Sequence, residues 1–178
     1  MSSRRTFETL VLPHLDAAYN LARWLLRDER SAEDAVQEAS LRAFRYIGSL
    51  RGDDARAWLL GIVRNTCFTL LERQRNGPDL VEFDDAEFEA ALGADHGGGA
   101  DPAAQLEQRR LRTQIDAAIR ALSPPLREVI VLREFEDLDY AQIAQIVAVP
   151  VGTVMSRLSR AREKLRAALT KTYSGPTP

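Results

Sequence analysis

The residues with the clearest chemical potential lie near the C-terminus, in a short helix, a tight turn and a longer helix over residues 139–162. Apolar residues at helical spacing are predicted to face inward, namely Ile143, Ala144, Val147, Val154, Leu158, Ala161 and Leu165. The outward face of the second helix carries hydroxyl and basic groups, namely Thr153, Ser156, Arg157, Arg160, Arg162 and Lys164. Helix-turn-helix spacing with such groups suits base edges and phosphates. We therefore predict DNA binding, with a solvated basic face on a helix bundle as the alternative.

A second set combines two carboxylates with an amide near residue 36. Asp34, Gln37 and Glu38 stand at positions i, i+3 and i+4, which places them on one face of a helix. Spacing alone favours a solvated acidic face. The alternative is a docking surface for a basic partner protein.

A third set mixes basic and aromatic residues between positions 49 and 75. The arginines of this segment surround Trp58, Asn65 and Phe68, and they are Arg51, Arg56, Arg64, Arg73 and Arg75. Basic residues interleaved with aromatic rings suit single-stranded or distorted nucleic acid. For Trp58 itself, a place in the core is favoured over stacking on a base.

Amphipathic helices are predicted to position all three sets. Apolar residues recur every three or four positions over residues 6–27, with a bend or restart near Pro13. Further helices are predicted from a cap at Ser31 to about Ile47, where Gly48 ends the helix, and from a cap at Asp53 or Asp54 to Arg75. In the C-terminal part, helices are predicted over residues 104–122, 124–135, 140–147 and 151–170.

The turn of the predicted helix-turn-helix contains Ala148 where many such motifs have glycine. We therefore expect a turn that does not need a left-handed residue at this position.

A charge break separates the two helical blocks. Residues 79–101 carry eight acidic residues and no lysine or arginine, and Gly97-Gly98-Gly99 lies among them. Such a segment has too few apolar residues to build a core, so we predict a flexible acidic linker. The formal net charge of −2 therefore conceals two basic blocks and an acidic tether, which is expected to discourage unspecific DNA binding.

Several functions are disfavoured by what the 178 residues lack. The chain has no phosphate-binding GxxxxGK[ST] loop and no GxSxG elbow, and neither His14 nor His96 has the spacing of a metal ligand or a catalytic base. The single cysteine, Cys67, indicates a reducing compartment and is interpreted as a core residue, not a nucleophile or an oxidation sensor. No apolar run is long enough for a membrane span.

Together the motifs resemble sigma factors of the extracytoplasmic-function class, which are compact sigma-70 proteins with only regions 2 and 4. Residues 34–38 with Phe44-Arg45 resemble the region 2 helix that binds the polymerase clamp, and residues 57–65 resemble the −10 recognition helix that follows it. Three further stretches resemble region 4, namely residues 122–129, residues 140–144, and residues 150–154 with Ser156-Arg157 and Arg160-Ala161-Arg162. The resemblance covers nearly the whole chain except the acidic segment and the tail.

The resemblance implies a role for each set of residues. Core RNA polymerase would be bound by Asp34, Gln37 and Glu38 on the coiled coil of its largest subunit, and region 4 helices would meet its flap. The −10 element would be contacted by Ser49, Leu50, Arg51, Arg56, Arg64 and Asn65, with a flipped base held by the loop. The −35 element would be contacted in its major groove by Thr153, Met155, Ser156, Arg157, Ser159 and Arg160. An anti-sigma factor is implied as inhibitory partner, and no cofactor is implied.

We therefore expect an all-α, cytoplasmic, non-enzymatic protein that directs promoter-specific initiation and helps to melt the −10 region. Its expected parts are region 2 over residues 1–77, the linker over 78–102, region 4 over 103–173 and a tail over 174–178. Two alternatives stay open, which are a stand-alone helix-turn-helix repressor or activator that needs no polymerase, and a module that binds only proteins.

Overall fold

The computed structural model describes residues 2–77 and 101–173, and every regular element within these two ranges is helical. The first range contains α1 (Ser3–Leu10), the 3-10 turn η1 (Leu12–His14), α2 (Leu15–Leu26), α3 (Glu29–Tyr46), the 3-10 turn η2 (Ile47–Ser49) and α4 (Ala55–Asn76). The second contains α6 (Pro102–Arg120), α7 (Pro124–Ile130), the π-helical segment η3 (Val131–Phe135), α8 (Tyr140–Val147) and α9 (Val151–Tyr173). The expected all-α fold class is confirmed.

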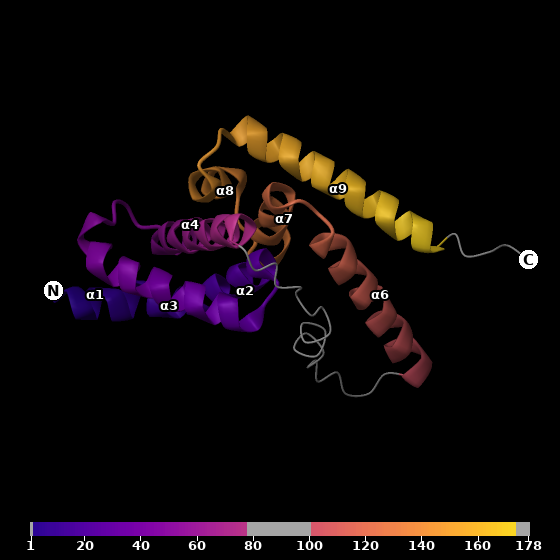
Figure 1. Ribbon diagram of the computed structural model, residues 1–178, viewed down its shortest axis with the longest axis horizontal. Coiled ribbons are helices and arrows are strands. Elements are labelled where there is room, and N and C mark those ends of the chain that lie inside the picture. Colours follow the sequence, from indigo (N-terminus) through magenta and orange to yellow (C-terminus); the bar gives the residue numbers. More distant parts are fainter. Residues whose placement is uncertain (1, 78–100, 174–178) are drawn as a thin grey trace, which may run out of the picture.

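The N-terminal half is a bundle in which α2, α3 and α4 pack on one another (Figure 1). The buried face of α3 consists of small residues, namely Ala32, Ala35, Ala39 and Ala43. Small side chains let neighbouring helix axes approach closely, and α2 and α4 fill the interior with residues such as Trp24 and Leu59. The opposite face of α3 is thereby directed toward water.

Local signals explain most of the helix boundaries in this half. The predicted interruption near Pro13 is present, since η1 contains Pro13 and separates α1 from α2. Of the two aspartates proposed as caps, Asp54 caps α4, because its Oδ1 accepts a hydrogen bond of 2.8 Å from the Ala57 amide. Cys67 has no exposed surface and belongs to the core, as predicted.

The predicted cap of α3 is wrong. Asp28, not Ser31, caps this helix, and its Oδ2 accepts a hydrogen bond of 2.8 Å from the Ser31 amide. The reason is the short connection from α2, where Arg27 adopts a left-handed conformation with φ of 61°. The chain then passes through the extended Asp28 straight into the next helix, so α3 begins at Glu29.

The C-terminal half contains the predicted helix-turn-helix in α8 and α9. Asp139 and Gln142 form a reciprocal capping box that fixes the start of α8. Val154, Leu158 and Ala161 are buried on the inner face of α9, as predicted. The expectation for the turn is wrong, because Ala148 is left-handed, with φ of 55° and ψ of 46°. This conformation lets the amides of Ala148 and Val149 both reach the carbonyl of Ala144 at the end of α8.

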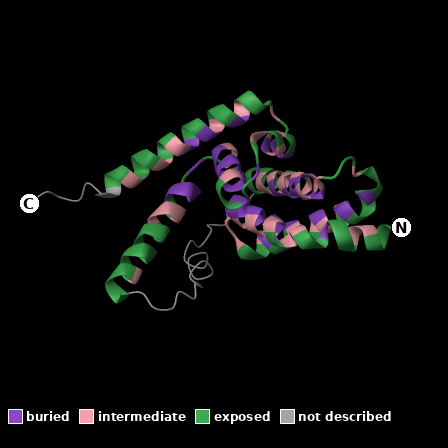
Figure 2. Ribbon diagram, turned by 180° about the vertical axis from the view of Figure 1, so that it is seen from behind, coloured by how far each residue is buried: buried purple, intermediate pink, exposed green. Residues whose placement is uncertain are grey.

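The two halves pack against each other, which the prediction of two tethered domains does not include. Helix α4 packs on α8, and α2 packs on α7, so that buried residues of both halves form one cluster (Figure 2). The outer parts of α6 and α9 extend away from this cluster (Figure 1). In the part of the chain that the structure describes, no single helix is long and apolar enough to cross a membrane, and α8 and α9 pass that test only as a pair bent by 99°.

Most of the predicted linker, residues 78–100, lies outside the described residues. Its last two positions belong to the start of α6, because Asp101 caps this helix and Pro102 is its first residue. Proline is well suited to a first helical turn, where an amide donor is not needed.

Ala148→Gly is expected to raise the free energy of unfolding by about 0.5–1 kcal/mol, because a left-handed backbone is strained for alanine and not for glycine. Ala148 is exposed, so the change removes little packing. Urea denaturation followed by circular dichroism measures the change. In the control, Ala141→Gly within α8 should lower stability. A loss of stability in the first variant would contradict the assigned turn.

Cys67 is expected to resist alkylation in the native protein at pH 8. Burial raises the pKa of its thiol to about 12, so the reactive thiolate is scarce at this pH. Labelling with iodoacetamide and mass spectrometry should show modification only after urea is added. A Lys171→Cys variant provides an exposed thiol as the control, and equally fast native labelling of Cys67 would refute its assignment to the core.

Candidate functional site

The predicted −35 residues are brought together on the outer face of the first turns of α9. Met155, Ser156, Ser159 and Arg160 are exposed, and Thr153 and Arg157 are half-buried at the edges of this face. The buried side of the helix holds it on α7 and α8. One basic residue departs from the predicted face: Arg162 turns toward η3, where its Nη2 lies 3.1 Å from Glu134 Oε1. The hydrogen bonds to Glu134 and Tyr140 raise the pKa of Arg162.

The predicted acidic set lies on the outer face of α3. Asp34 and Gln37 are exposed, while the half-buried Glu38 accepts a hydrogen bond from Arg42 one turn later. One neighbour on this face was not among the predicted residues: Leu41 is 58% exposed and follows Gln37 by four residues. Phe44 follows Leu41 by three residues and is 43% exposed, and neighbouring exposed apolar residues rimmed by polar ones can mark a protein-binding surface. The position of Leu41 on the same face as Gln37 was available from the sequence.

The predicted −10 residues divide into two groups. Ser49 and Arg51 are exposed at the turn that precedes α4, and Leu50 packs partly against the core. On α4, Asn65 is exposed, but Arg56 and Arg64 both point toward the C-terminal half of the chain. The structure therefore does not bring all six residues onto one open surface.

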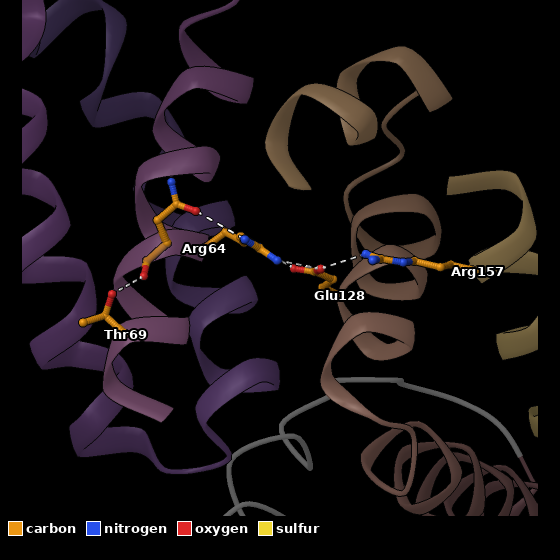
Figure 3. Close-up of polar contacts among 5 residues, drawn as sticks. Arg64, Thr69, Glu128 and Arg157 are labelled. Atoms are coloured by element: carbon orange, nitrogen blue, oxygen red, sulfur yellow. Dashed lines mark hydrogen bonds and ion pairs between the residues drawn. The ribbon is translucent and has the colours of Figure 1, made fainter. Parts of the chain in front are cut away.

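Arg64 and Arg157 share one carboxylate, that of Glu128 on α7 (Figure 3). Arg64 donates from Nε to Oε2 at 2.8 Å and from Nη2 to Oε1 at 3.2 Å, and its guanidinium lies 4.0 Å from the ring centre of Phe68. Arg157 Nη1 lies 3.6 Å from Oε1 on the other side. Burial raises the pKa of Glu128, whereas the two arginines favour its charged form. One predicted −10 residue is thus joined to one predicted −35 residue.

A second carboxylate makes a similar connection. Glu136 follows η3 and is only 8% exposed. Its Oε2 accepts a hydrogen bond of 2.7 Å from Arg56 Nη2, and its Oε1 accepts one of 2.7 Å from Asn20 Nδ2. Asp54 and Gln142 add a bond of 2.8 Å from Gln142 Nε2 to Asp54 Oδ2. These contacts lie where α2 and α4 face the C-terminal half.

A buried arginine completes the boundary between the halves. The guanidinium of Arg127 donates to four backbone carbonyls, those of Trp24, Ile119, Arg120 and Leu122. Burial, together with the nearby charges of Arg27 and Arg120, lowers its pKa to about 10. No role was predicted for Arg127 and Glu128, although two adjacent charges inside the apolar stretch 126–132 were a visible signal.

None of these sites has the composition of a metal centre. The described ranges 2–77 and 101–173 contain no group of three or more histidine, cysteine or acidic side chains that could hold a metal ion. Glu128 and Glu136 at the boundary pair with arginines.

Comparison with known families matches both halves of the chain. Residues 10–77 match sigma-70 region 2, and residues 112–165 match sigma-70 region 4. These ranges contain the three predicted sets of binding residues. They also contain Glu128 and Glu136, the acidic residues that pair with the arginines of α4.

Full-length relatives and solved structures extend the similarity. The RNA polymerase sigma-H factor of Pseudomonas aeruginosa is 39% identical over 173 residues, which cover 93% of this chain and 87% of that protein. The ECF RNA polymerase sigma-E factor of Escherichia coli is 38% identical over 138 residues, covering 74% and 70% of the two chains.

Two solved structures have a similar fold, and each is a complex with a second protein. The sigma factor RpoE, bound to the anti-sigma factor NepR from Bartonella quintana, has a TM-score of 0.68 and 26% identity over 92% of this chain and 96% of that chain. The structure of CnrH with the cytosolic domain of CnrY has a TM-score of 0.63 and 26% identity over 94% and 90%. The chain belongs to the extracytoplasmic-function class of the sigma-70 family, whose members are non-enzymatic sigma factors that direct transcription initiation by RNA polymerase.

Proposed function

We propose that the chain joins core RNA polymerase through α3 and reads promoter DNA at two places, the −10 element through α4 and the −35 element through α9. The observation that carries this proposal is that one chain has both an exposed acidic face in region 2 and a basic recognition helix in region 4. A repressor has no use for the first surface. A module that binds only proteins has no use for the second.

The polymerase contact is assigned to Asp34, Gln37 and Glu38, with Leu41 as an apolar neighbour. In this proposal the carboxylates meet basic residues on the coiled coil of the largest subunit, and Leu41 supplies the contact that excludes water. Region 4 helices would meet the flap of the polymerase.

The proposed division of the chain places region 2 in residues 1–77 and region 4 in residues 103–173, with a linker over 78–102 and a tail over 174–178.

The −10 contact is assigned to the turn before α4 and to α4 itself. The loop from Ser49 to Arg56 would hold a base flipped out of the duplex, and unstacking one base costs a few kcal/mol. Arg51 is exposed at this turn and available to phosphate. Arg64 and Asn65 would contact the backbone of the melted strand farther along the helix.

The −35 contact is assigned to the outer face of α9. Arg160, Ser156 and Ser159 are exposed there, beside Met155. In a helix-turn-helix, the first turns of the second helix enter the major groove, where arginine and hydroxyl side chains reach base edges and phosphates. Thr153 and Arg157 flank this surface.

The proposed regulator is an anti-sigma factor. One solved relative named above is a complex with an anti-sigma factor, and the other is a complex with the cytosolic domain of CnrY. An inhibitor of this kind would cover the polymerase-binding and DNA-binding faces of both halves. The proposed place of action is the cytoplasm, where core polymerase works.

Transcription in vitro tests the central proposal. Purified chain and core polymerase are combined with a library of promoter fragments, and initiation from a defined set with shared −10 and −35 sequences is expected. DNA binding and repression without polymerase would instead indicate the stand-alone regulator. No promoter-specific initiation by folded chain and active core would overturn the proposal.

Asp34→Ala with Glu38→Ala is expected to weaken binding of core polymerase at least about tenfold, equivalent to about 1.4 kcal/mol. The physical reason is the loss of both carboxylates on the docking face of α3. Fluorescence anisotropy with a labelled chain measures the dissociation constant. Glu29→Ala with Glu33→Ala removes two carboxylates from the same helix outside the assigned set and should change affinity much less. Equal losses in both variants would refute a specific docking face.

Arg157→Ala with Arg160→Ala is expected to lower the affinity of the holoenzyme for −35 duplex at least about tenfold. The slope of log affinity against log salt concentration should also fall by about one for each phosphate contact that is lost. The matched control, Arg166→Ala with Lys171→Ala, changes the same charge on exposed positions of α9. Unchanged affinity in the first variant would favour the protein-binding module.

A further inference from the structure

We propose that Glu128 and Glu136 of region 4 hold the free chain in a closed form, in which their carboxylates occupy the arginines that promoter DNA would need. This inference rests on the proposed function, because that function assigns Arg56, Arg64 and Arg157 to DNA. The closed form would be an autoinhibitory state of the chain alone, separate from any inhibitor protein.

The arginines that are paired at the boundary are ones assigned to DNA. Three of the assigned arginines face the boundary, and each has a carboxylate of region 4 as its partner: Arg56 pairs with Glu136, while Arg64 and Arg157 pair with Glu128. The assigned arginines that lie away from the boundary, Arg51 and Arg160, are exposed. The occlusion therefore affects chiefly the −10 surface of α4.

Arg64 binds the carboxylate of Glu128 with two parallel donors. Its Nε and Nη2 donate side by side to the two oxygens of Glu128, at 2.8 and 3.2 Å. This parallel arrangement of two donors is also the one by which arginine binds two oxygens of a phosphate. Glu128 thus uses the donors that a DNA phosphate would use, and both acceptors cannot be bound at once.

In the closed form, DNA has little access to the arginines that pair with Glu128. Glu128 has no exposed surface, and the side chains of Arg64 and Arg157 are only 19% and 24% exposed. A DNA strand that is to reach Arg64 must first separate α4 from α7 and α8. The closed form therefore excludes DNA from this part of the −10 surface by packing as well as by charge.

The free energy needed to open the boundary is limited, because water can replace ion-pair contacts. Pairing recovers part of the hydration that buried charges lose, so a buried ion pair often contributes little net stability. When the halves separate, water rehydrates Arg64 and the side of Glu128 that faced it, while Arg157 stays beside Glu128 within region 4, and opening is within reach of the binding free energy of polymerase and DNA. The acidic face of α3 stays exposed in the closed form. Polymerase can therefore dock on region 2 before the halves part.

The first test measures the distance between the halves. Glu128→Gln with Glu136→Gln keeps side-chain shape and removes both charges, whereas Glu134→Gln with Glu163→Gln changes net charge equally at exposed positions. Fluorescent labels are placed on Arg30→Cys and Lys171→Cys, and the native Cys67 is buried and stays unlabelled. Energy transfer should change in the first variant and match the parent chain in the control. A folded first variant, verified by circular dichroism, with the parent's energy transfer would overturn the proposal.

The second test measures occlusion directly. In the absence of polymerase, a fluorescent single strand carrying the −10 sequence should bind the Glu128→Gln, Glu136→Gln variant at least about threefold more tightly than the parent, because a larger fraction of the chain is competent. The charge-matched control should bind as the parent does. If the variant opens and binds no better, the occlusion is refuted.

The two proposals can fail separately. The energy-transfer experiment needs neither polymerase nor DNA, so a chain that never initiates transcription would refute the proposed function while leaving the closed form measurable. A chain that initiates normally, and whose halves stay together after loss of both carboxylates, would refute only the closed form.

Discussion

The arrangement of the whole molecule depends on one electrostatic constraint, which is that a carboxylate without solvent must be compensated by nearby cations. Glu128 meets this constraint with Arg64 from the N-terminal half and Arg157 from α9. The guanidinium of Arg64 is itself held between this carboxylate and the ring of Phe68. A single buried charge therefore links α4, α7 and α9, and it does so through two arginines that are proposed to bind DNA.

The sequence predicted the elements well because their signals are local. The limits of α8 follow from a capping residue and a turn, and the buried positions of α9 follow from apolar spacing. The predicted start of α3 was wrong because Asp28 and Ser31 are both good caps. Which of them caps the helix depends on how α2 ends at Arg27. The prediction for Ala148 was wrong because the turn between two packed helices requires a left-handed residue there, and packing can impose that strain on alanine.

The candidate sites were predictable as sets of residues but not as surfaces. Helical spacing was enough to place Asp34 and Gln37 together on one face, and the exposure of Arg160 also follows from it. The positions of Arg56 and Arg64 depend on partners 80 and 64 residues away along the chain. No local pattern encodes such pairs, and a charge break between two blocks favours the opposite picture of halves that stay apart.

The contacts across the boundary are built so that neither half loses its own helix ends when they separate. Asp54 caps α4 through Oδ1 and uses only Oδ2 for Gln142, while Gln142 keeps its capping box with Asp139. Arg127 has three carbonyl acceptors in its own half and one across the boundary, at Trp24. Trp24 lies in the last turn of α2, where carbonyls take donors from outside the helix and water can serve. These polar groups can thus exchange partners for water, so that the ion pairs of Glu128 and Glu136 and apolar contacts such as Trp24 with Phe135, at 5.3 Å between ring centres, are the parts of the interface that oppose opening.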